Sequence, residues 1–130
     1  MSTPAELMLT EALAAQKFTR KFFVVELDFA EHTIGVLDEQ CKAASYALRG
    51  GLTPENIDKL TQLWGAYLGE VIRRNSAGQW SVISVEGVDK YALELGDVRV
   101  FPHDLVRQRL VEGPAASLAA SYATAKASLA

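Results

Sequence analysis

The sequence has few of the residues that bind metals or form disulfides. Its 130 residues include one cysteine, Cys41, and two histidines, His32 and His103. A single cysteine excludes an intramolecular disulfide, and a zinc site built from histidine and cysteine usually has four ligands where this chain offers three. We therefore expect no metal and no cofactor, and the shortage of cysteine fits a reducing compartment.

Neither a strong excess of charge nor a long apolar run occurs in the sequence. The 13 basic and 16 acidic residues give a formal net charge of -3 at pH 7, so no general attraction to nucleic acid or anionic lipid is expected. No apolar run is long enough to cross a bilayer, and Glu6 and Glu11 fall where a signal peptide would be apolar. These absences favour a soluble, cytoplasmic protein that binds neither nucleic acid nor membranes.

The composition that remains is that of an ordinary globular protein. Hydrophobic residues make up 49% of the chain and charged residues 22%, which is the range of folded soluble domains. A length of 130 residues suits one domain with a core of its own. The sequence shows neither an internal repeat nor a linker, so we expect residues 1–130 to form a single domain.

The first two helices can be recognised from their capping residues. Thr3 precedes a proline and stands three residues before Glu6, the pattern of a capping box, and it predicts a helix to about Gln16. Asp28 and Glu31 repeat the capping-box pattern before a second, amphipathic helix. The apolar positions of this second helix are Ile34, Leu37, Cys41, Ala44 and Leu48.

A third helix is predicted from Thr53, which caps it, to about Asn75, and it contains two interior glycines. Gly65 and Gly69 lie about one turn apart beside the apolar face, where each costs the helix roughly 1 kcal/mol relative to alanine. Glycines at such positions usually permit a close backbone approach. Either another element of the same chain packs there, which we favour, or a ligand or a partner chain does. The apolar face consists of Ile57, Leu60, Trp64, Tyr67, Leu68 and Val71.

Alternation of apolar and polar residues predicts three strands in the second half of the chain. Residues 79–85 and 91–95 alternate with a period of two. The glycine at position 96 and the aspartate after it are a tight-hairpin signal before a third strand at residues 98–101. Residues 22–25, an aromatic and β-branched run, are a candidate fourth strand at the N-terminal side.

Two more helices are predicted at the C-terminal end. The first follows Pro102 and ends at Gly113, and the second is rich in alanine. This order of helices, strand meander and helices indicates an α+β fold. In it, a small antiparallel sheet of three strands, with the candidate N-terminal strand as a fourth, packs against several helices. The stripe by which the last helix would pack consists of Leu118, Tyr122, Ala125 and Leu129.

Glu70 is the residue of the third helix that could carry chemistry. It stands one turn before Arg74, at the spacing of a surface ion pair, and we favour this structural interpretation. The alternative makes Glu70 a partly buried acid with a raised pKa, in a pocket walled by Trp64, Tyr67 and Trp80. The candidate groove, either binding or structural, comprises Trp64, Gly65, Tyr67, Gly69, Glu70 and Trp80.

Structural roles are expected for the other reactive side chains. His103 stands between Pro102 and Asp104, where a polar residue caps a helix or lies at the surface. Cys41 falls on the apolar face of its helix and is expected to be a small buried hydrophobe. No serine has the glycine context of a nucleophile elbow, and no glycine-rich loop matches a phosphate cradle. We therefore assign no catalytic residue.

The block from Leu63 to Tyr122 resembles a group of small, uncharacterised bacterial proteins. The helix "LWGAYLGEVIRR" carries their G-A-Y-x-G-E motif, and "GQW" supplies the glycine and strand tryptophan that follow it. A strand ending in a proline and a helix with a basic-hydrophobic-x-x-Gly finish, "VRVFPHDLVRQRLVEG", complete the likeness over about half of the chain. The resemblance implies a bacterial origin and a shared fold, and it assigns no activity to any residue.

The leading hypothesis is a non-enzymatic protein-interaction domain. It rests on the acidic composition of a compact domain and on the lack of any recognisable set of catalytic residues. A cognate inhibitor, an immunity factor and an adaptor are its concrete forms, and the partner is another protein, with a homodimer also open. The alternative is a small-molecule-binding or hydrolytic domain whose pocket is the candidate groove, with Glu70 as acid or base. A deep pocket around Glu70 would favour this alternative, whereas an exposed patch of several hundred Å² elsewhere would favour the interaction domain.

Overall fold

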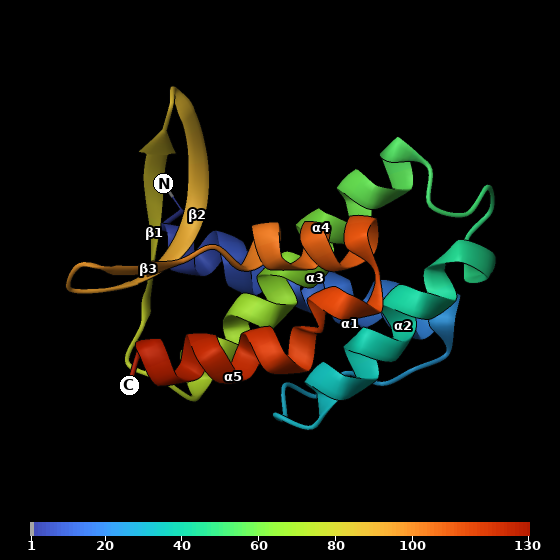
Figure 1. Ribbon diagram of the computed structural model, residues 1–130, viewed down its shortest axis with the longest axis horizontal. Helices are drawn as coiled ribbons and strands as arrows, with labels where there is room; N and C mark the ends of the chain where they lie inside the picture. Colours follow the sequence, from blue (N-terminus) through green and yellow to red (C-terminus); the bar gives the residue numbers. More distant parts are fainter. Residues whose placement is uncertain (1) are drawn as a thin grey trace.

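The computed structural model describes residues 2–130 and confirms the predicted α+β class, with five α-helices and a three-stranded antiparallel sheet in these residues (Figure 1). Among the described residues, no helix is both long and apolar enough to cross a membrane. The elements in chain order are α1 (Pro4–Phe23), α2 (Thr33–Ala47), α3 (Pro54–Arg74), β1 (Gln79–Val85), β2 (Val88–Leu95), β3 (Val98–Val100), α4 (Pro102–Glu112), the short 3-10 helix η1 (Pro114–Ala116) and α5 (Leu118–Ser128).

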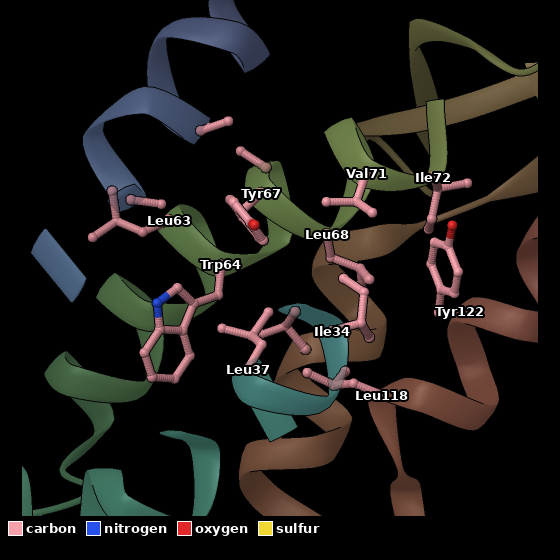
Figure 2. Close-up of a cluster of buried hydrophobic side chains, with 14 of the residues drawn as sticks. Ile34, Leu37, Leu63, Trp64, Tyr67, Leu68, Val71, Ile72, Leu118 and Tyr122 are labelled. Atoms are coloured by element: carbon pink, nitrogen blue, oxygen red, sulfur yellow. The ribbon is translucent and has the colours of Figure 1, made fainter. Parts of the chain in front are cut away.

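The hydrophobic core surrounds α3, which packs most extensively against α1 and α4 and also contacts α5. Consecutive residues of α3 from Leu63 to Ile72 are all buried, so the helix is covered on every side over this stretch. Figure 2 shows its side chains meeting Ile34 and Leu37 of α2 and Leu118 of α5. The sequence predicted that only one face of α3 is buried. In the structure this stretch of the helix is buried on all sides, so more of α3 lies in the core than was predicted.

The sheet is a meander in which β2 pairs with β1 on one side and β3 on the other. A two-residue turn joins β1 to β2, and Glu86 and Gly87 both have the positive φ, 52° and 81°, that a type I′ turn requires. The predicted second turn is also present, where Gly96 has a φ of 58°. Figure 1 shows that the turn end of the β1–β2 hairpin projects beyond the helices.

The candidate strand at residues 22–25 is wrong, because α1 continues to Phe23 and residues 2–130 contain no strand before β1. Val24 ends the helix in the left-handed conformation, with a φ of 56°. Phe23 packs edge-on against Trp64 with 5.2 Å between ring centroids, whereas Phe22 is 46% exposed. An aromatic run that looks like a buried strand is therefore the last turn of a helix, held by a contact with a residue distant in sequence.

The second capping box is also wrong, since α2 starts at Thr33 after an N-cap without a side-chain hydrogen bond. The Asp28 carboxylate instead accepts from the backbone N–H of Ala30 at 3.0 Å, which makes a local turn. Glu31 reaches α5, where it accepts from Tyr122 and from Nζ of Lys126. The acidic residues that resembled a cap thus shape the α1–α2 loop and attach it to α5.

Other local predictions are confirmed. Thr3 and Glu6 form the reciprocal capping box, and the Thr53 hydroxyl accepts from the N–H of Asn56 at 3.1 Å. The α5 stripe faces the core as expected, because all four of its predicted residues are buried. These features depend on residues that are neighbours in the chain, which is why the sequence alone reveals them.

Candidate functional site

The groove beside Gly65 and Gly69 is filled by side chains of the same chain. A Cβ built on Gly69 would lie 2.1 Å from the Trp80 ring, and one built on Gly65 would lie 2.4 Å from the His103 ring. Pro102 also comes within 3.1 Å of the Gly69 position. The glycines therefore allow β1 and the start of α4 to pack directly on the α3 backbone, as the favoured interpretation expected.

His103 differs from its expected surface or capping role, because its ring is packed over Gly65. The ring centroid lies 6.4 Å from that of Trp80 and 6.3 Å from that of Tyr91. Burial lowers the pKa of His103, although the nearby Asp104 carboxylate acts in the opposite direction. The imidazole is consequently a neutral packing group at pH 7.

Glu70 is buried, with 1% of its surface exposed. The prediction that it forms an ion pair at the protein surface is therefore wrong. Its carboxylate accepts from Trp80 Nε1 at 2.9 Å and from Arg73 Nε at 2.8 Å, while Arg74 is 3.8 Å away. Burial raises the pKa of Glu70, but the hydrogen bonds from Arg73 and Trp80, with the charges of Arg73 and Arg74, outweigh it and lower the pKa overall. The alternative of a raised pKa suited to proton transfer is therefore also wrong.

Trp64 and Tyr67 point away from Glu70 and do not form a pocket with it. Trp64 donates from Nε1 to the Thr19 hydroxyl of α1 at 3.0 Å. The Tyr67 hydroxyl accepts from the backbone N–H of Phe29 at 2.9 Å and is 2.6 Å from the Thr33 hydroxyl. Figure 2 shows the two rings diverging from α3. Of the six groove residues, Gly69, Glu70 and Trp80 thus meet one another, whereas Trp64 and Tyr67 contact other elements.

The Tyr67 hydroxyl links α3 to the α1–α2 loop, and its removal tests this role. Tyr67→Phe should lower the free energy of unfolding by about 1–2 kcal/mol, because the N–H of Phe29 loses its buried acceptor. Urea unfolding measures the change. Tyr46→Phe is the matched control, since Tyr46 is 79% exposed, and it should change stability by less than about 0.5 kcal/mol.

Two cavities of the molecule are not lined by any of the six groove residues. One of about 540 Å³ runs between the β3–α4 segment and α5, next to Val100, Leu105 and Thr124. Another of about 410 Å³ lies between α1, α3 and Tyr91. Cys41 is buried as expected, and burial raises its pKa to about 12, so its thiol stays protonated at neutral pH.

Sequence analysis did not identify a polar cluster that ties α2, α4 and α5 together. The buried Arg109 donates from Nε to the Asp38 carboxylate at 3.0 Å and from Nη2 to the Asp38 carbonyl at 3.1 Å. The same carboxylate accepts from the N–H groups of Leu118 and Ala119 in the first turn of α5, each at 2.9 Å. Because these groups bind one another, the cluster is a cross-link within the fold, and no local sequence pattern brings residues 38 and 109 together.

The outer edge of β1 offers unpaired backbone groups. Val85 and Val88 flank a two-residue turn, so they form a hydrogen-bonded pair, and such pairs alternate along the ladder. Trp80, Val82 and Ser84 consequently direct their N–H and C=O groups away from β2. No other backbone group of residues 2–130 bonds to these outward groups. α1 packs against β1, but no strand of residues 2–130 pairs with this edge, so its outward groups can serve as a template for another strand.

The two edges of the sheet differ in how they are protected against pairing. Natural edge strands are protected from pairing with other chains because they are short, carry charged residues or proline, or contain a bulge. β3 has three residues with Arg99 at its centre, whereas β1 has seven residues, no charge and no proline. β1 also pairs with β2 without a bulge, and Val82 at its centre is 44% exposed. The segment "QWSVISV" already shows in the sequence that this strand has neither a charged residue nor a proline. That the strand lies at the edge of the sheet follows only from the topology.

Comparisons with known proteins do not assign the chain to a family. No protein-family model matches it, and no match was found among curated proteins or among solved structures. The resemblance of residues 63–122 to small bacterial proteins stays a prediction.

Proposed function

We propose that the protein is a non-enzymatic protein-interaction domain that binds an extended strand of another protein chain along the outer edge of β1. The observation that carries this proposal is the row of outward backbone groups at Trp80, Val82 and Ser84, on a hairpin whose turn end projects beyond the helices (Figure 1). Addition of a strand to such an edge is an established mode of protein recognition, in which main-chain hydrogen bonds supply the affinity.

The chemistry of β1 indicates what kind of strand would bind. The strand has no charged residue, and its side chains alternate between two faces, with Val82 on one and Ile83 on the other. A partner segment with apolar or small side chains at alternate positions would continue both faces of the sheet. A cognate inhibitor, an immunity factor or an adaptor in a bacterial cytoplasm could use such an edge, and we propose these as the forms of the function.

The alternative function, a small-molecule-binding or hydrolytic domain, is less well supported at its proposed site. Its acid, Glu70, is held by Trp80 and Arg73, and its lowered pKa suits neither a general acid nor a general base near neutral pH. Its groove is occupied by the Trp80 and His103 rings. A ligand could enter there only if β1 or α4 moved off α3.

The proposal predicts that a proline at the centre of β1 abolishes partner binding without unfolding the sheet. The N–H of Val82 faces outward, so Val82→Pro removes no hydrogen bond to β2, and proline is tolerated on the open side of an edge strand. Affinity capture from a lysate of the source organism should recover a partner with the native chain and lose at least about 90% of it with Val82→Pro, which corresponds to roughly tenfold weaker binding.

The matched control is Arg99→Pro, which places the same residue at an outward position of the opposite edge strand, β3. This variant should retain the partner. Loss of the partner from both variants, with intact folding by circular dichroism, would locate the interaction elsewhere. Equal recovery by the native chain and Val82→Pro would contradict the proposed role of the β1 edge.

A further inference from the structure

We propose that the strand which pairs with the β1 edge is the β1 strand of a second copy of this chain, in an antiparallel arrangement centred on Val82. The two sheets would then form one continuous six-stranded sheet. This inference rests on the proposed function, since it uses the same edge, and it identifies the partner. Three features of β1 support it. Its outward backbone groups are symmetric about the central residue, it carries no charge, and its side chains are compatible in size with those of an identical strand.

The backbone groups of β1 are arranged symmetrically about the middle of the strand. β1 runs from Gln79 to Val85, so Val82 is its central residue, with Trp80 and Ser84 two positions to either side. All three direct their N–H and C=O groups outward. A twofold axis at Val82 places Val82 opposite Val82 of the partner subunit and Trp80 opposite Ser84 of the partner subunit. This register gives three hydrogen-bonded pairs with two bonds each.

The absence of charge in β1 favours pairing with itself. In an isologous contact every side chain meets the surface of an identical strand, so a charged strand risks placing like charges together, which is destabilising. β1 carries no charge, whereas β2 has Asp89, Lys90 and Glu94 and β3 has Arg99. Of the three strands in the described residues, β1 is thus the one that can meet its own copy without repulsion.

The side chains that meet across the twofold axis are compatible in size. Val82, which is 44% exposed, would contact Val82 of the partner subunit, and β-branched pairs are favourable neighbours across strands. Ser81 would lie opposite Ile83 of the partner subunit and the larger Trp80 opposite the small Ser84 of the partner subunit. In these last two pairs a large residue faces a small one, which limits steric conflict between the two strands.

The first test is the mass of the native chain in solution. Size-exclusion chromatography with light scattering should show the mass rising with concentration from 14.1 kDa towards about twice that value. Hydrogen exchange then locates the contact. The outward amides of Trp80, Val82 and Ser84 should become at least about tenfold better protected as the dimer forms, whereas those of Ser81 and Ile83, already bonded to β2, should not change.

The second test asks whether residue 82 meets its own symmetry mate. Val82→Lys should be monomeric, because two lysines would face each other, and Val82→Glu should be monomeric for the same reason. An equimolar mixture of Val82→Lys and Val82→Glu should form a dimer again, since the two charges are then opposite in sign. Val88→Lys is the matched control, as Val88 is 58% exposed on β2, and it should dimerise like the native chain.

The outcomes separate this inference from the proposed function. A chain that stays monomeric at all concentrations overturns the second-copy inference, and the proposed function survives if capture of another protein is lost with Val82→Pro. A dimer that persists in Val82→Lys alone, or one not restored by mixing the two charged variants, also overturns the register. A dimer restored only by mixing supports it.

Discussion

Replacement of Gly69 by leucine should cost the protein about 3 kcal/mol of unfolding free energy, at the upper end of overpacking effects. A Cβ at this position would lie 2.1 Å from the Trp80 ring, so the tryptophan must move. Its Nε1 would then leave the Glu70 carboxylate, to which it donates at 2.9 Å. Helix propensity alone predicts the opposite sign, because leucine is a better helix former than glycine by roughly 1 kcal/mol.

Urea unfolding of Gly69→Leu measures this effect, and Gly35→Ala is its control. Gly35 lies in α2 with nothing within 4 Å of its Cβ position, so alanine there meets open space. Gly35→Ala should raise stability by about 0.5–1 kcal/mol through propensity. If Gly69→Leu also raised the stability, the contact between Trp80 and the α3 backbone would not exist in solution.

Glu70→Gln should lower the unfolding free energy by about 2 kcal/mol at pH 7, more than the sequence-based expectation of a surface pair allows. The carboxylate accepts from Arg73 and Trp80 at the same time. Oε2 accepts from Trp80 Nε1 and Arg73 Nε, and Oε1 accepts from Arg73 Nη2. In glutamine one of these oxygens becomes an NH2 group, so the donors at that position lose their acceptor and the ion pair with Arg73 loses its negative charge. Arg73 is itself 35% exposed, which keeps the loss below that of a fully buried pair.

The effect of Glu70→Gln should depend on pH with a defined sign. The folded-state pKa of Glu70 is lowered below the ordinary value of 4.5. The carboxylate therefore contributes stability that is fully present above pH 4.5 and is lost as the pH falls through the lowered pKa. The stability difference between the native chain and the variant should be constant from pH 7 to about pH 5 and shrink below pH 4.

Chemical unfolding across this pH range checks the expectation, with Glu94→Gln as control. Glu94 pairs with Arg99 at 2.9 Å on an exposed part of the sheet, where a single ion pair contributes less than about 1 kcal/mol. A similarly small loss for Glu70→Gln would show that the Trp80–Glu70–Arg73 contact is not formed. A difference that grew at low pH would contradict the lowered pKa.

The sequence revealed only part of the candidate groove. It indicated that Gly65 and Gly69 mark a close approach, because interior glycines need a reason in any helix. It did not indicate that His103 and Trp80 fill the space, since these residues lie in other elements. The sequence did not indicate the lowered pKa of Glu70 either. That pKa depends on the contact of Trp80 with α3 and on Arg73, and not Arg74, as the main partner of the carboxylate.

The sequence by itself determined the elements whose causes are local. These elements depend on residues that are neighbours in the chain, so their patterns can be recognised in the sequence. They include the helix caps at Thr3 and Thr53, the glycine turn at residue 96 and the alternating strand at residues 79–85. Only the tertiary structure decided that Phe23 ends a helix, because its ring packs on Trp64, and that β1 lies at an open edge. Burial and strand order depend on which distant segments meet, and no local pattern encodes that choice.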